Sequence, residues 1–187
     1  MSQILHVYFL DLAELQAVTG SKDEQLQDRI LGRGHDCFSR NSPSADRDGH
    51  VVRNREALRA IFAGGPFESQ LAEHYIDALE LICDELSSDG GAVEFRFGDR
   101  YLPTAIEDLA TSMMGEDPFP GIVGLASSIN VAERNGWGYM STEDCAAELE
   151  EWEDYVPEEP DDLGSFVVDW LREAIAADKG IIGFWGG

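Results

Sequence analysis

Short apolar runs near both ends of the chain predict strands. Residues 3–10 contain ILHVYFL and residues 180–185 read GIIGFW, both rich in β-branched and aromatic side chains. The segment VEFRF at 93–97 alternates apolar and polar residues, and residues 136–140 are also expected to be extended. Because strands from opposite ends of a chain can pair within one sheet, this pattern predicts a sheet that ties down both termini.

Apolar residues spaced three or four apart predict helices between these strands. The longest such segment covers residues 68–86, and a second amphipathic helix follows residue 163. Shorter helices are predicted over 12–18, after Ser21, over 54–62, from about 104 to 114, and over 142–154. One face of the longest helix is expected to lie in the core, with these residues: Leu71, Tyr75, Leu79, Ile82 and Leu86.

Polar residues indicate where several of these helices begin. Ser21 has a glutamate three positions later, which is the spacing of a capping box. Asn54 and Ser141 stand directly before predicted helices and are expected to cap them. Gly20 is expected to end the first helix, because glycine readily adopts the left-handed conformation at that position.

Together these elements predict an α+β fold. We expect one compact domain over residues 1–187, in which a small sheet that includes the N- and C-terminal strands is packed by several amphipathic helices. A long polar loop is expected at about 32–53, where glycine, serine, aspartate and asparagine replace the apolar periodicity. His74, on the longest helix, is expected at the surface or at its boundary.

The net charge limits the class of ligand. With 13 Lys and Arg against 37 Asp and Glu, the formal charge is −24, which repels nucleic acid and anionic membrane surfaces. The same charge attracts a basic protein, a polyamine or a divalent cation. Acidity that serves only solubility, or adaptation to salt, is the alternative interpretation.

The acidic residues are concentrated in the last third of the chain. Residues 135–171 contain 12 acidic residues and neither lysine nor arginine, and aromatic residues are interleaved with them. This pattern predicts a helix with a charged outer face and a binding surface for a basic partner. The candidate binding residues are Glu150, Glu151, Trp152, Glu153, Asp154 and Tyr155.

Arginine and histidine gather in residues 33–59, which favours a second class of site. Six arginines and two histidines lie in this segment and are suited to an anionic substrate. The segment also carries weak candidates for metal ligands of mixed N, O and S type. These candidates are His35, Cys37, Asp46, Asp48 and His50.

Several sequence features argue against common enzymes. The chain lacks a GxSxG elbow, an HExxH helix, a Walker loop and a GxGxxG turn. Cys83 and Cys145 lie on predicted helices, where cysteine usually behaves as a small apolar residue. A cysteine nucleophile paired as His35 with Cys37, and a pair of acidic catalytic residues, stay open as minor alternatives, and no cofactor is predicted.

The cellular location is expected to be the cytoplasm. The three cysteines form neither a CxxC pair nor a dense framework, which is typical of a reducing compartment. The first residues lack the basic start and the small-residue cleavage site of a signal peptide. No segment approaches the roughly 20 apolar residues that cross a membrane.

Four segments carry a resemblance to known sequences. They are LHVYFLDL, ALELICDEL, GYMSTEDCAAELEEW and GIIGFWGG. Together they resemble a family of uncharacterised bacterial proteins and, more distantly, the YfbM-like proteins, which have a comparable glycine-aromatic turn before an acidic helix. The resemblance implies a compact α+β fold and carries no established activity, cofactor or catalytic residue.

The sequence therefore leaves two functional hypotheses beside a third, a purely structural housekeeping subunit. The first is a non-enzymatic acidic interaction module, of the immunity type or a regulatory inhibitor, that binds a basic protein. The second is a small enzyme or metal-dependent protein that uses the arginine and histidine residues of 33–59.

Overall fold

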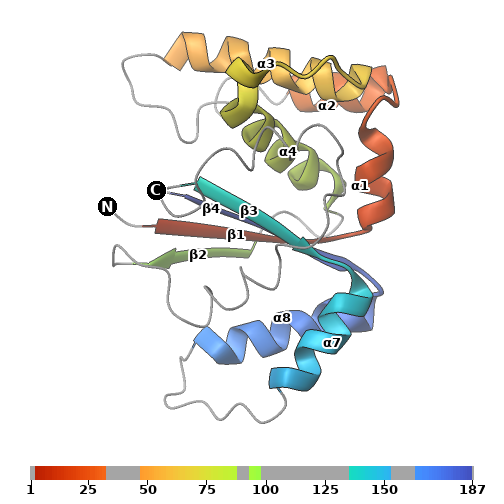
Figure 1. Cartoon of the computed structure of the whole chain (residues 1–187), viewed down its shortest axis with the longest axis vertical. Coiled ribbons are helices and arrows are strands. Elements are labelled where there is room, and N and C mark those ends of the chain that lie inside the picture. Colours follow the sequence, from red (N-terminus) through yellow and green to blue (C-terminus); the bar gives the residue numbers. More distant parts are fainter. Residues whose placement is uncertain (1–2, 33–46, 88–92, 98–134, 153–162, 187) are drawn as a thin grey trace. The chain divides into compact units, whose positions relative to one another are not determined.

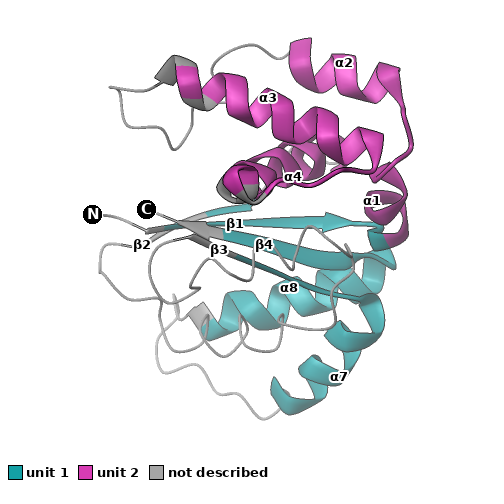
Figure 2. Cartoon of the chain, turned by 45° about the horizontal axis from the view of Figure 1, so that its top comes forward, with its two compact units in different colours: residues 1–12, 91–116, 134–187 teal, residues 13–90, 117–133 magenta. Residues whose placement is uncertain are grey.

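The computed structural model describes residues 3–32, 47–87, 93–97, 135–152 and 163–186. Figure 1 labels the helices and strands along the chain. The chain divides into two compact units, which Figure 2 distinguishes by colour. We call residues 1–12, 91–116 and 134–187 the sheet unit, and residues 13–90 and 117–133 the helical unit.

The sheet unit contains four antiparallel strands, which confirms that both terminal strands belong to one sheet. They are β1 (Gln3–Leu10), β2 (Val93–Phe97), β3 (Asn135–Met140) and β4 (Gly180–Gly186), in the order β2-β1-β4-β3. β1 and β4 pair over their length, from Ile4 opposite Gly186 to Leu10 opposite Gly180. The two ends of the chain therefore form the centre of the sheet.

One face of this sheet packs against two helices, α7 (Thr142–Trp152) and α8 (Leu163–Ala177). Because side chains alternate along a strand, every second residue of each strand points to the helices. The buried cluster on this face consists of Leu5, Val7, Met140, Cys145, Val167, Trp170, Leu171, Ala174 and Ile181. Burial of this apolar surface is the main force that holds α7 and α8 on the sheet.

Aromatic side chains line the other face. Tyr8 meets Phe184 edge to face, with 5.8 Å between ring centroids. Phe184 stacks with Trp137 at 6.4 Å, and Trp137 stacks with Tyr139 at the same distance. Tyr8 and Phe184 are buried, so their ring contact stabilises the fold in addition to the apolar area that they bury.

The helical unit is built from α1 (Leu12–Val18), α2 (Glu24–Gly32), α3 (Arg47–Ala63) and α4 (Ala72–Leu86), with a short 3-10 helix η2 (Ser69–Leu71) before α4. The stripe predicted for the longest helix is buried from Leu71 to Ile82, while Leu86 is half-buried. The described residues thus form six α-helices and a four-stranded sheet, and the fold class is α+β as predicted. None of the described helices is long and apolar enough to cross a bilayer.

The turn between α1 and α2 is hydrogen-bonded to the end of α3. The N–H groups of Gly20 and Lys22 donate to the carbonyls of Ile61 and Phe62, at 2.9 and 3.0 Å. A helix leaves its last carbonyls without intrahelical donors, so these bonds satisfy them. Gly20 and Gly64 both have positive φ, and a Cβ on Gly64 would lie 3.1 Å from the Gly20 Cα. The close approach explains why glycine is needed at both positions.

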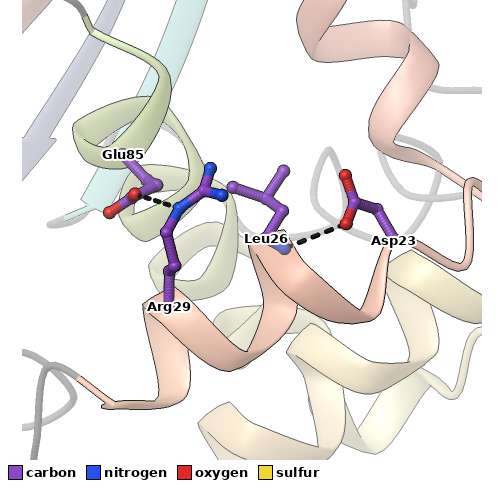
Figure 3. Close-up of polar contacts among 4 residues, drawn as sticks. All are labelled: Asp23, Leu26, Arg29 and Glu85. Carbon is purple, nitrogen blue, oxygen red and sulfur yellow. Dashed lines mark hydrogen bonds and ion pairs between the residues drawn. The ribbon is translucent and has the colours of Figure 1, made fainter.

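The cap of α2 differs from the prediction. Asp23, not Ser21, caps the helix: its carboxylate accepts the N–H of Leu26 at 3.0 Å (Figure 3). Ser21 instead accepts the N–H of Asp23 at 3.2 Å. Figure 3 also shows Arg29 of α2 donating to Glu85 of α4 at 2.8 Å, which adds a charged contact between these helices.

The predicted polar loop is too long at its C-terminal end. Residues 33–46 lie outside the described residues, but α3 begins at Arg47, so residues 47–53 are helical. Asn54 is therefore inside the helix and does not cap it. Val51 and Asn54 are both buried, and the polar side chain at the second position interrupts the apolar periodicity that would have marked the helix. The helix expected at about 104–114 lies outside the described residues.

Candidate functional site: the outer face of helix α7

A reciprocal cap fixes the start of α7. Ser141 accepts the N–H of Asp144 through its hydroxyl at 3.1 Å, and the Asp144 carboxylate accepts the N–H of Ser141 at 2.9 Å. The Ser141 hydroxyl also donates to that carboxylate at 2.6 Å. This is a capping box with aspartate at the third helical position, and it confirms Ser141 as the cap. Asp144 therefore has a structural role.

The inner face of α7 attaches the helix to the sheet unit. Cys145 is fully buried, and Leu149 and Trp152 pack against the same buried cluster. The indole N–H of Trp152 donates to the Glu148 carboxylate at 2.9 Å, one helical turn away. Trp152 is half-buried: part of its side chain packs against the sheet unit, and the rest is exposed. Glu148 is occupied by the same contact.

The outer face of α7 carries exposed acidic residues. Glu143, Glu150 and Glu151 are exposed, as are the small side chains of Ala146 and Ala147 between them. In the part of the chain that the structure describes, no cationic group lies within ion-pair distance of these three carboxylates. We call Glu143, Glu150 and Glu151, with the two alanines, the acidic face.

Glu150 and Glu151 take no part in the contacts of the described residues that hold α7 in place. The cap at its start is made by Ser141 and Asp144, and the side-chain contact near Trp152 is made by Glu148.

The two described cysteines are held as neutral thiols. Burial, followed by the charge of Asp144, raises the pKa of Cys145 from its ordinary value of 9.0 to about 11. Burial likewise raises the pKa of Cys83, with further contributions from Glu80 and Asp84. Because the thiolate is the reactive form, neither cysteine is suited to nucleophilic catalysis.

The raised pKa of Cys145 predicts a loss of stability at high pH. Above pH 9.0 the unfolded thiol ionises while the folded thiol stays protonated to about pH 11, so stability is intact below pH 9.0 and declines between these values. The decline approaches about 1.4 kcal/mol per pH unit for one such group. Urea unfolding of wild-type and Cys145→Ala protein from pH 8 to pH 10.5 measures it; equal pH dependence in the two proteins would contradict the assignment.

Other candidate residues of the sequence fall into two groups. Glu153, Asp154 and Tyr155 lie outside the described residues, as do His35, Cys37 and Asp46. Asp48 and His50 are in the first turns of α3, so a calcium-type loop does not extend from Asp46 through this segment. Among the residues that the structure describes, no three His, Cys, Asp or Glu side chains gather in a metal-binding arrangement.

The described arginines of the basic segment lie on α3. Arg53 and Arg59 are exposed, and Arg55 is half-buried. α3 contains four arginines against Asp48 and Glu56, so it carries a net charge of +2 in a chain of −24. The structure thus places Arg53 and Arg59 on the surface of the helical unit, on one helix.

A buried polar network joins α3 to α4 and was missed from the sequence. His74 Nδ1 lies 2.6 Å from Asn54 Oδ1, and Asn54 Nδ2 donates to the Asp77 carboxylate at 3.1 Å. The donation to Asp77 assigns the amide nitrogen, so Asn54 Oδ1 accepts from a protonated His74 Nδ1. Only 5% of His74 and 1% of Asn54 is exposed, so His74 is a core residue and not a surface residue. Its spacing from Leu71 and Ala78 was the available signal.

The comparisons with known proteins give a family and no activity. The family model described as domain of unknown function (DUF7691) matches residues 1–186. The chain therefore belongs to this family, and the expected resemblance to uncharacterised proteins is confirmed to that extent. Neither the curated proteins nor the solved structures contain a match.

Proposed function

We propose that this protein is a non-enzymatic interaction module, of the immunity type or a regulatory inhibitor, whose acidic face binds a basic protein. The observation that carries the proposal is the outer face of α7: Glu143, Glu150 and Glu151 are exposed there, and no cationic group of the described residues forms an ion pair with them. Asp144 and Glu148, the other two acidic residues of α7, make hydrogen bonds that stabilise the helix itself. The carboxylates of the acidic face can therefore be replaced without removing the hydrogen bonds that stabilise α7.

The affinity is expected to come from charge complementarity between the acidic face and a basic partner. Exposed ion pairs contribute little singly, but a negative surface accelerates encounter with a positive partner and selects against anionic ones. The chain's formal charge of −24 acts in the same direction over longer distances. Binding is therefore expected to be fast and sensitive to salt. A cytoplasmic location, a bacterial origin and the more distant YfbM-like relationship belong to the same proposal and rest on the sequence alone.

The exposed arginines of α3 support a second candidate. Arg53 and Arg59 are suited to an anionic substrate or to a metal-dependent activity that uses the segment 33–59. The described cysteines are buried, and the described residues contain no metal-binding cluster. This candidate is therefore supported by the arginines alone.

Affinity capture from a lysate of the native cell tests the acidic face. Wild-type protein is expected to retain a basic protein that moderate salt elutes, because salt screens exposed charges. The combined Glu150→Lys and Glu151→Lys variant is expected to lose at least about tenfold in captured partner, a loss of 1.4 kcal/mol.

Glu173→Lys is the matched control. Glu173 is exposed on α8 in the same unit, so this variant tests whether any change of charge has the effect. It is expected to capture the partner nearly as well as wild type. Equal losses in the α7 and α8 variants, or capture that salt does not affect, would remove the proposal.

A further inference from the structure

We draw no further inference here: the strongest candidate, the buried polar network of His74, Asn54 and Asp77 between α3 and α4, belongs to the packing of the helical unit already described, and its contacts do not show whether protonation of His74 would strengthen or weaken it.

Discussion

Replacement of Gly180 by alanine is expected to destabilise the protein by about 3 kcal/mol, at the upper end of the cost of overpacking. A Cβ on Gly180 would lie 2.6 Å from the carbonyl oxygen of Met140 and 2.7 Å from Cγ of Leu12. The Met140 oxygen belongs to the backbone of β3, so it cannot move away as a flexible side chain can. The sheet itself must shift.

The surrounding chain leaves little freedom for such a shift. α8 ends in a left-handed Asp178, where the N–H of Lys179 donates to Ala174 O at 2.9 Å. This pattern reverses the chain directly into β4, whose first residue, Gly180, is opposite Leu10 of β1. A displacement of Gly180 would therefore disturb both the helix end and the central strand pair.

Gly32→Ala is the matched control for this prediction. Gly32 is the last residue of α2, and a Cβ there would meet no atom within 4 Å. This variant is expected to be neutral or more stable by about 0.5–1 kcal/mol, because alanine favours helix. Urea unfolding followed by circular dichroism measures both variants. Equal stability of Gly180→Ala and wild-type protein would show that the close packing around Gly180 is wrong.

The second large effect is expected in the buried network of the helical unit. Asn54→Leu removes the acceptor of His74 and the donor to Asp77, and is expected to cost about 2–3 kcal/mol. His74→Leu leaves Asn54 Oδ1 buried without that donor and is expected to cost a similar amount. The physical reason is the desolvation of a polar group that has lost its partner, more than the bond itself.

A double-mutant cycle separates this network from ordinary packing. When both partners become leucine, no orphaned polar group is left between them, so the double variant is expected to be at least about 1 kcal/mol more stable than the sum of the single effects implies. Ile82→Val, elsewhere on the buried face of α4, is the control and is expected to add independently to Asn54→Leu. Additive losses from Asn54 and His74 would contradict the hydrogen bond.

The regular elements could be predicted from the sequence because their local signals agree with their packing. The strand at Gln3–Leu10 and the helix at Leu12–Val18 have the predicted bounds, since an apolar β-rich run is followed at once by a helical pattern. β2 has the predicted bounds too, through its alternation. In these segments propensity, pattern and burial indicate the same structure.

The start of α3 could not be predicted because its local signals indicate a loop. Asp48 and Gly49 favour a turn, and Asn54 occupies a core position where periodicity leads one to expect an apolar residue. Contact with α4 through His74 overrides those preferences. A hydrogen bond between residues 20 positions apart leaves no mark in either local segment. The Asp23 cap was missed for a simpler reason, because Ser21 showed the capping-box spacing and Asp23 did not.

The sequence predicted the negative charge of the candidate site. It did not predict which acidic residues stabilise α7 and which are exposed to solvent. Composition located an acidic helix, and Ser141 marked its beginning. Only the structure shows that Asp144 and Glu148 make contacts within the helix and that part of Trp152 packs against the sheet unit, which leaves Glu143, Glu150 and Glu151 as the exposed acids. Charge density in a sequence does not distinguish a carboxylate that caps a helix from one that faces solvent.

The central claim is tested most directly by the salt dependence of partner affinity, measured for wild-type protein and for the combined Glu150→Gln and Glu151→Gln variant. Wild-type affinity is expected to fall steeply as salt increases, and the variant is expected to bind more weakly at low salt and to show a flatter dependence. Both variant effects follow from loss of two exposed charges on α7. Identical salt dependence and affinity for the two proteins would show that the acidic face does not bind the partner.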